Sequence, residues 1–142
     1  MWIGNSQDAA DERTIRENGI NAILNVAQDL PCTMQRAKGI KSYHCGLRDC
    51  EENLLTEYYS ALLSLHSLVR RKKTVLVHCH GGRSRSALVV CSHLVLKGRY
   101  RNLAEAEEYV RSVHAATKIH EAHKAVVTDE RLFALKGFIL QG

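Results

Sequence analysis

The segment from Val75 to Cys91 constrains the fold of this 142-residue chain more than any other. A short apolar run ends in His78 and Cys79, a loop with two glycines follows, and a long apolar stretch begins after Ser86. The run before the loop predicts a buried strand, and the stretch after it predicts a buried helix. A loop between a strand and a helix directs backbone N–H groups and the positive end of the helix to one point. The segment therefore predicts an anion site.

The rest of the chain alternates between predicted strands and helices. The predicted strands cover residues 2–3, 20–26, 40–45 and 74–78. The predicted helices cover 9–18, a segment opened by Thr56 as cap, 86–97, a segment capped by Asn102, and a C-terminal part that includes 130–138. An irregular connection around Pro31 separates the second and third strands. This order predicts a single domain over residues 1–142 with an α/β fold, in which helices flank a central, mostly parallel sheet of about four to five strands.

The net charge and the cysteines indicate which ligands and which cellular compartment suit the protein. The formal net charge is +5, with basic clusters within residues 70–73 and 97–101. These clusters suit solvated helix ends, or alternatively they attract acidic ligands such as a phosphopeptide, an anionic lipid headgroup or nucleic acid. Five cysteines form no disulfide framework, and no apolar segment is long enough to span a bilayer. These features predict a cytoplasmic protein, with the nucleus as an alternative.

Cys79 is the candidate nucleophile, because it lies at the base of the predicted anion site and a thiol in a positive field ionises more readily. Arg85 is the candidate phosphate clamp, since its planar guanidinium can hold two phosphoryl oxygens at once. The residues between them are candidate phosphate ligands, and their two glycines allow a close approach of the backbone. These residues are His80, Gly81, Gly82, Arg83 and Ser84. Ser86 is expected to hydrogen-bond the thiolate, and His78 is expected to order the loop.

Cleavage of a phosphate ester also needs a proton for the leaving oxygen. A single carboxyl group can supply that proton and then activate the water that completes the reaction. Asp49 fits this role, because it follows the predicted strand at 40–45 and a glycine and precedes a predicted helix. Glu51 and Glu52 are alternatives by position alone, although acidic residues ahead of a helix also suit its N-terminus without any catalytic role.

The spacing from Cys79 to Arg85, preceded by a histidine and followed by a serine, resembles the signature of the cysteine-based protein tyrosine phosphatase superfamily. The short chain, the position of the candidate acid, the opening at 2–5 and the run at 23–26 are similar to the small atypical dual-specificity phosphatases. The resemblance covers residues 2–114. It implies a phosphocysteine intermediate, formed without a metal or other cofactor. It also implies a shallow cleft that accepts phosphoserine and phosphothreonine as well as phosphotyrosine in protein substrates.

Two departures from that family keep the substrate class open. His80 and Arg83 make the loop more basic, and phosphoinositide and phosphatidylglycerophosphate phosphatases of the same superfamily resemble the chain at these two positions. The alternative substrate is therefore a phosphoinositide, another phospholipid or an inositol phosphate, whose additional phosphates these side chains would bind. The stretch 118–132 also lacks the Arg and Asn-x-Gly-Phe pattern common near the end of these domains, so its contacts are not predicted.

Other functions have less support in the sequence. No metal site is predicted, because the histidines beside Cys79 are its direct neighbours, and His120 and His123 are three positions apart where a zincin helix has four. A non-catalytic phosphate-binding module would not need a nucleophile. A nucleic-acid substrate such as an RNA 5′-triphosphate lacks a supporting cluster of stacking aromatic residues. A disulfide from Cys45 or Cys50 to Cys79 would protect the nucleophile under oxidation.

Overall fold

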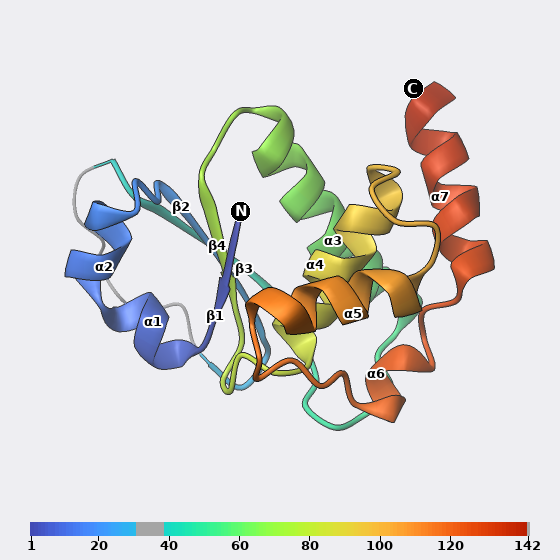
Figure 1. Ribbon diagram of the computed structural model, residues 1–142, viewed down its shortest axis with the longest axis horizontal. Coiled ribbons are helices and arrows are strands. Elements are labelled where there is room, and N and C mark those ends of the chain that lie inside the picture. The colour runs from blue at the N-terminus through green and yellow to red at the C-terminus, as the bar shows by residue number, and fades with distance from the viewer. Residues whose placement is uncertain (31–38, 142) are drawn as a thin grey trace.

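The computed structural model describes residues 1–30 and 39–141, and its centre is a four-stranded sheet (Figure 1). The strands are β1 (Trp2–Gly4), β2 (Ala22–Ala27), β3 (Lys41–Leu47) and β4 (Val75–His78). They are ordered β1-β4-β2-β3, and each neighbouring pair is parallel. The predicted α/β fold with a central parallel sheet is therefore confirmed.

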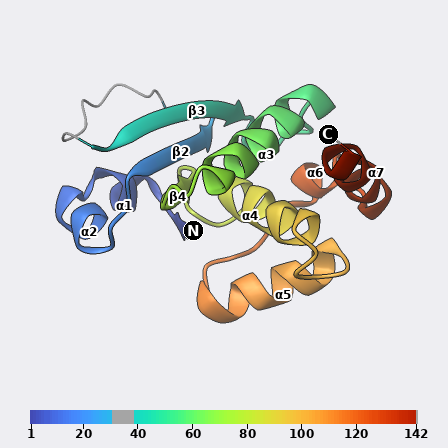
Figure 2. The ribbon, with the colours of Figure 1, turned by 90° about the horizontal axis from the view of Figure 1, so that it is seen from above.

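Helices cover both faces of this sheet. They are α1 (Ser6–Ala10), α2 (Glu12–Glu17), α3 (Leu55–Arg70), α4 (Arg85–Leu96), α5 (Leu103–Val113), α6 (Glu121–Lys124) and α7 (Asp129–Gln141). Figure 1 shows α1 and α2 on one side of the sheet and the other helices on the opposite side. Seen from above, α3 and α4 lie next to the sheet, and α5 and α7 lie beyond α4 (Figure 2).

Alternating side chains of β2 and β4 divide the core into two parts. Leu24 and Val77 belong to the large cluster under α3 and α4, whereas Ile23 and Leu76 join Ile15 of α2 on the other face. Both strands are buried throughout, as expected for the central strands of a parallel sheet that is covered on both faces. Because the strands are parallel, their carboxyl ends share one edge, and the connections that follow β2, β3 and β4 meet there.

The prediction of one helix over residues 9–18 is wrong, since the structure has two short helices with a break at Asp11. The Asp11 carboxylate accepts hydrogen bonds from the backbone N–H of Thr14 at 3.2 Å and from its hydroxyl at 2.7 Å. This local hydrogen bonding caps α2 and competes with continuation of α1.

The predicted caps of two later helices have different outcomes. Thr56 does not cap α3, because this helix begins one residue earlier, and the N–H of Leu54 donates instead to the carboxylate of Glu57 at 3.1 Å. The Asn102 cap of α5 is confirmed, because its side-chain oxygen accepts the N–H of Glu105 at 2.9 Å.

The C-terminal helix predicted over 130–138 lies within α7, and α6 is a short turn of helix before it. The basic clusters at 70–73 and 97–101 follow or overlap the C-terminal ends of α3 and α4, as expected for cations at solvated helix ends. The predicted irregular connection around Pro31, and Cys32 with it, falls outside the described residues. Within residues 1–30 and 39–141, none of the helices combines the length and apolar character needed to cross a bilayer.

Candidate active site

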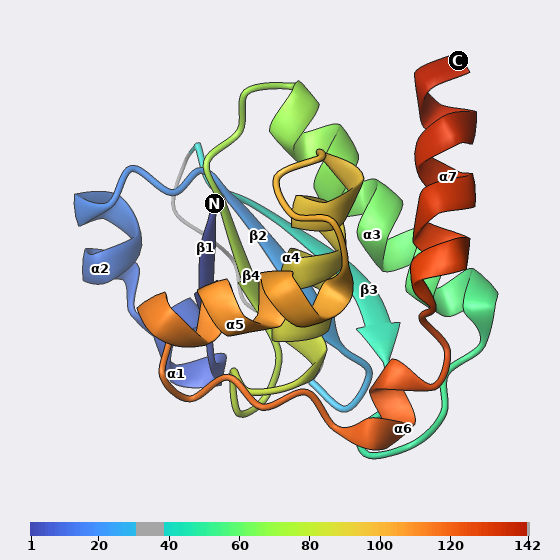
Figure 3. The same cartoon turned by 45° about the vertical axis from the view of Figure 1, so that its right-hand side comes forward.

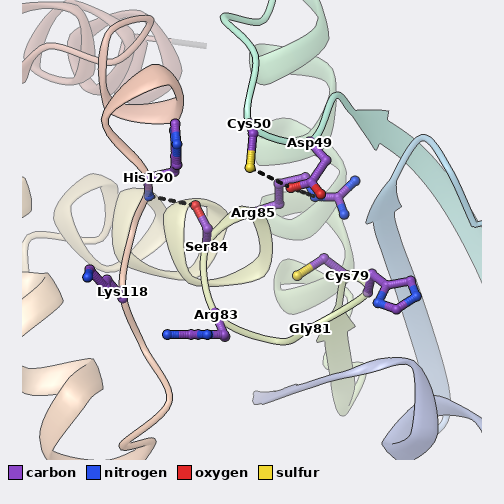
Figure 4. A pocket seen from close by; sticks show the side chains of 10 residues that line it. Asp49, Cys50, Cys79, Gly81, Arg83, Ser84, Arg85, Lys118 and His120 are labelled. Carbon is purple, nitrogen blue, oxygen red and sulfur yellow. Dashed lines mark hydrogen bonds and ion pairs between the residues drawn. The ribbon is translucent and has the colours of Figure 1, made fainter.

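Cys79 lies directly after β4, at the base of a pocket of about 460 Å³ (Figure 4). Its Sγ atom is 3.3 Å from the hydroxyl oxygen of Ser86, which stands in the first turn of α4. Both residues are buried. A hydroxyl group at this distance can donate to a thiolate and stabilise negative charge on the sulfur.

The loop between Cys79 and Arg85 is held from outside through three of its carbonyl groups. The donor and acceptor pairs are Ser6 N–H to His80 O at 3.1 Å, His114 Nε2 to Gly82 O at 2.6 Å, and Lys118 N–H to Arg83 O at 2.9 Å. These carbonyl oxygens are therefore directed toward the neighbouring segments and not into the loop. A loop that turns its carbonyls outward suits the binding of an anion by its N–H groups.

Gly82 has a structural reason to be glycine that the sequence did not reveal. Its φ angle is +65°, and a Cβ atom built on it would lie 2.8 Å from the backbone of Gly4 at the end of β1. Gly82 is buried against this strand, whereas Gly81 lines the pocket. Both glycines were expected to let the backbone approach phosphate closely. The geometry favours this role for Gly81, which lines the pocket, more than for Gly82.

Arg85 is fixed by groups at the carboxyl ends of two strands. Its side chain is 2% exposed, and its Nη1 donates to the Asp29 carboxylate, just after β2, and to the Leu47 carbonyl oxygen at 3.1 Å at the end of β3. The hydrogen bond from Arg85 holds the pKa of Asp29 below its usual value. A buried guanidinium needs such partners, and they fix the direction in which its remaining N–H groups point.

Asp49 lies on the connection between β3 and α3 and lines the pocket. Its carboxylate is 3.8 Å from Nε of Arg85, and its side chain is 59% exposed. The exposed residues Glu51 and Glu52 are not among the residues that line this pocket. Of the three carboxylates considered from the sequence, Asp49 is therefore the one that shares the pocket of Cys79.

Cys50, next to Asp49, also lines the pocket, and its thiol donates to the Asp49 carboxylate at 3.5 Å. Desolvation, followed by the hydrogen bond and the charge of Asp49, raises the pKa of the Cys50 thiol. Cys45 is placed differently, because its sulfur lies 3.2 Å from the hydroxyl of Ser64 on α3. Of the two cysteines considered as protective partners of Cys79, Cys50 is the one that shares its pocket.

Basic and polar side chains form the outer wall of the pocket (Figure 4). Arg83 and Ser84 come from the loop after β4, and Lys118 and His120 come from the segment between α5 and α6. His80 lines the same pocket. The wall thus places basic side chains around Cys79, which suits an anionic ligand.

His78 lies behind this loop and does not line the pocket. Its ring is buried, and its Nδ1 atom is 3.2 Å from the carbonyl oxygen of Cys79. This position suits the expected role in ordering the loop.

Sequence reasoning missed three residues of this site. Asp29 could have been found, because it is a carboxylate close to the carboxyl end of a predicted strand, where functional groups of parallel sheets gather. Lys118 and His120 gave no comparable signal, since they lie more than thirty residues after Cys79 in the stretch without a recognisable pattern. Only the packing of that segment against the loop brings them to the pocket.

Comparison with known proteins is consistent with this geometry. The family model described as "Dual specificity phosphatase, catalytic domain" matches residues 1–129. Dual specificity phosphatase 28 of Mus musculus is 31% identical over 113 residues, which cover 79% of this chain and 68% of that protein. Dual specificity protein phosphatase 4 of Homo sapiens is 31% identical over 113 residues, 78% of this chain, but the match spans only 28% of that longer protein.

A solved structure supports the same relationship. The crystal structure of a mouse putative dual specificity phosphatase complexed with zinc tungstate superposes with a TM-score of 0.74. Its sequence identity is 26%, and the match covers 96% of this chain and 84% of the mouse chain.

Proposed function

The chain belongs to the dual specificity phosphatase family and is a cysteine-based phosphatase, and we propose that it removes phosphate from phosphotyrosine and from phosphoserine or phosphothreonine in proteins. The observation that carries this proposal is the position of the Cys79 sulfur, 3.3 Å from the Ser86 hydroxyl at the base of a pocket that Arg85 and Asp49 also line. This shared pocket supports the assignment of Cys79 as nucleophile, Arg85 as phosphate clamp and Asp49 as proton donor.

In the first step the Cys79 thiolate attacks phosphorus, and the bond between phosphorus and the leaving oxygen breaks. The carboxyl group of Asp49 gives its proton to that oxygen, and phosphate remains bound to sulfur. Arg85 binds the equatorial oxygens through the N–H groups that do not bond to Asp29 and Leu47. The backbone N–H groups of the loop share the developing negative charge.

In the second step the Asp49 carboxylate takes a proton from water, and the resulting nucleophile attacks phosphorus. The bond between sulfur and phosphorus breaks, which releases inorganic phosphate and restores the thiolate. The Ser86 hydroxyl donates to the departing sulfur, and this hydrogen bond makes the thiolate a better leaving group.

Replacement of the nucleophile tests this proposal. Cys79→Ser is expected to abolish turnover of 4-nitrophenyl phosphate and of a phosphotyrosine peptide, while tungstate or phosphate still binds in calorimetry. Retained binding would show that the loop is intact, because Arg85 and the loop N–H groups hold the anion without the sulfur. Full activity of this variant would contradict the mechanism.

A substrate with a second anionic group is the other candidate, and the outer wall of the pocket favours it. Arg83 and Lys118 line the wall, and neither makes an ion pair with another described residue. Two unpaired cations beside a phosphate loop suit the additional phosphates of a phosphoinositide or an inositol phosphate.

The two substrate classes are separated by kcat/KM on phosphopeptides, on phosphoinositide vesicles and on soluble inositol phosphates. If the substrate is a phosphoprotein, the peptides give the highest values, and Arg83→Ala changes them by less than about threefold, as expected for an exposed charge. If the substrate is polyphosphorylated, Arg83→Ala lowers kcat/KM about tenfold or more on inositol compounds alone. Arg99→Ala is a matched control, because Arg99 follows the end of α4 that is about 18 Å from the loop.

The cytoplasmic location of the protein, with the nucleus as the alternative, stays a prediction. The described cysteines, Cys45, Cys50, Cys79 and Cys91, are free thiols, which suits a reducing compartment. We also keep as a prediction that residues 1–142 form one catalytic domain.

A further inference from the structure

We propose that His123 is a positioning residue that couples the phosphate-binding loop to the segment carrying Asp49. This inference rests on the proposed function, in which Asp49 is the proton donor. His123 belongs to α6 and lies beside the site without lining the pocket. Figure 3 shows that α6 lies near the carboxyl end of β3, where the Asp49 segment begins.

The His123 ring bridges two segments that are far apart in the sequence. Its Nδ1 atom is 2.5 Å from the hydroxyl oxygen of Ser84 in the phosphate-binding loop. Its Nε2 atom is 2.9 Å from the carbonyl oxygen of Arg48, the residue before Asp49. The side chain is fully buried, so water does not compete for either hydrogen bond.

The partners of the ring determine where its proton lies. A carbonyl oxygen only accepts, so Nε2 carries the proton and donates to Arg48. The backbone N–H of His120 donates to the Ser84 hydroxyl oxygen at 2.8 Å, which leaves the hydroxyl hydrogen free to donate to Nδ1. The neutral imidazole therefore satisfies every polar group in a chain that runs from His120 through Ser84 and His123 to Arg48.

The surroundings of His123 keep the ring neutral. Burial lowers its pKa, the hydrogen bond to the Arg48 carbonyl opposes this effect, and electrostatic interactions with Arg85 and His120 lower it further. Asp49 is the carboxylate that acts in the opposite direction. The centroid of the His120 ring is 5.6 Å from that of His123.

The hydrogen bond to Arg48 acts on Asp49 through the peptide bond that joins them. The carbonyl of Arg48 and the N–H of Asp49 belong to one rigid plane, so fixing the carbonyl also fixes the direction in which the chain enters Asp49. Asp49 has few restraints of its own, because its side chain is 59% exposed and its carboxylate is 3.8 Å from Nε of Arg85. Correct placement of a proton donor contributes strongly to catalysis, and an error of about 1 Å can cost about 100-fold in rate.

Three substitutions separate the two hydrogen bonds. In His123→Asn the amide lies near the position of Nδ1, which keeps the bond to Ser84 and loses the bond to Arg48. In His123→Gln the amide reaches the position of Nε2, which keeps the bond to Arg48. His123→Phe fills similar space without either bond.

The readout compares leaving groups. Departure of 4-nitrophenolate needs little protonation, whereas departure of phenolate from phenyl phosphate depends on the acid. His123→Asn and His123→Phe are expected to lower kcat/KM, which reports the steps up to departure of the leaving group, about tenfold on phenyl phosphate and less than about threefold on 4-nitrophenyl phosphate. His123→Gln is expected to stay near the wild type on both substrates. Inhibition by tungstate is expected to be unchanged in His123→Asn, because the Ser84 hydroxyl of the phosphate-binding loop keeps a hydrogen bond to the side chain at position 123.

Asp49→Asn is the control for this comparison of leaving groups. Direct loss of the acid should lower kcat/KM about 100-fold or more on phenyl phosphate and much less on 4-nitrophenyl phosphate. If Asp49→Asn responds in this way and His123→Asn follows the wild type, the inference is overturned and the proposed function stands. If Asp49→Asn shows no dependence on the leaving group, the acid assignment and the inference are overturned together. An equal loss of kcat/KM on both substrates in the His123 variants would also overturn the inference, because it would reflect general damage and not a misplaced acid.

A measurement on the unmodified protein keeps the proposal testable even where a variant fails to fold. The ¹⁵N chemical shifts of the His123 ring in the wild type should show a neutral ring protonated at Nε2 at neutral pH. A proton at Nδ1, or a doubly protonated ring, would contradict the hydrogen-bond chain directly.

Discussion

Replacement of His93 by leucine should make the folded state less sensitive to acid. His93 lies on α4 and is only 3% exposed, and its Nδ1 atom has no hydrogen-bond partner among the described residues. Its ring centroid is 5.9 Å from that of His66. Burial, with smaller contributions from His66 and Lys97, lowers the pKa of His93 from 6.5 to about 4.

The sign of the effect follows from the difference between these two values. Between pH 6.5 and about 4 the unfolded chain binds a proton at His93 that the folded protein does not bind, so the free energy of unfolding decreases as the pH falls. The two pKa values correspond to a loss of roughly 2 kcal/mol between about pH 7.5 and about pH 5, and of about 3 kcal/mol once the pH is low enough to protonate His93 in both states. His93→Leu should remove this loss.

Urea unfolding at the two pH values measures the difference. The wild type should lose roughly 2 kcal/mol more than His93→Leu on going to the lower pH. Val89→Ala on the same helix is a suitable control, because a smaller core side chain lowers stability by a similar amount at both pH values. An equal dependence on pH in the wild type and in His93→Leu would refute the argument that burial holds this ring neutral.

Two further pairs of substitutions test the packing of the phosphate-binding loop and of α5 against α6. Gly82→Ala should lower kcat/KM and cost about 1–3 kcal/mol of stability, because its Cβ would meet the end of β1 at 2.8 Å and its φ is +65°. Gly81→Ala should be much milder in thermal unfolding, since its Cβ would meet only side-chain atoms at 3.8 Å. Glu107→Gln should cost about 1–3 kcal/mol in urea unfolding, because this buried carboxylate joins α5 to Lys124 of α6 at 3.2 Å. Glu105→Gln, which breaks an exposed pair, should cost less than about 1 kcal/mol, and equal costs would contradict the role of burial.

The sequence specified those features that depend on near neighbours. An apolar run that ends at Cys79 and an apolar stretch after Ser86 predicted the strand, loop and helix, and in this local unit the sulfur and the hydroxyl are 3.3 Å apart. The order of strands and helices gave the parallel sheet, because parallel strands need crossover connections. The break at Asp11 was missed, since the choice between capping a new helix and continuing the old one depends on a small difference in local hydrogen bonding.

What only the tertiary structure decided is the choice of partners for the charged and polar groups. Asp29 reaches Arg85 because β2 lies between β3 and β4, and no spacing in the sequence encodes that neighbourhood. His123 joins Ser84 and Arg48, which are separated from it by 39 and 75 positions, because α6 folds back onto the edge where the strands end. The position of the candidate nucleophile, Cys79, thus depends on the local sequence, which determines the backbone conformation over a few residues. The hydrogen-bond partners of Arg85 and of the segment before Asp49 are selected by packing between distant segments, because a hydrogen bond requires proximity in space and not in the chain.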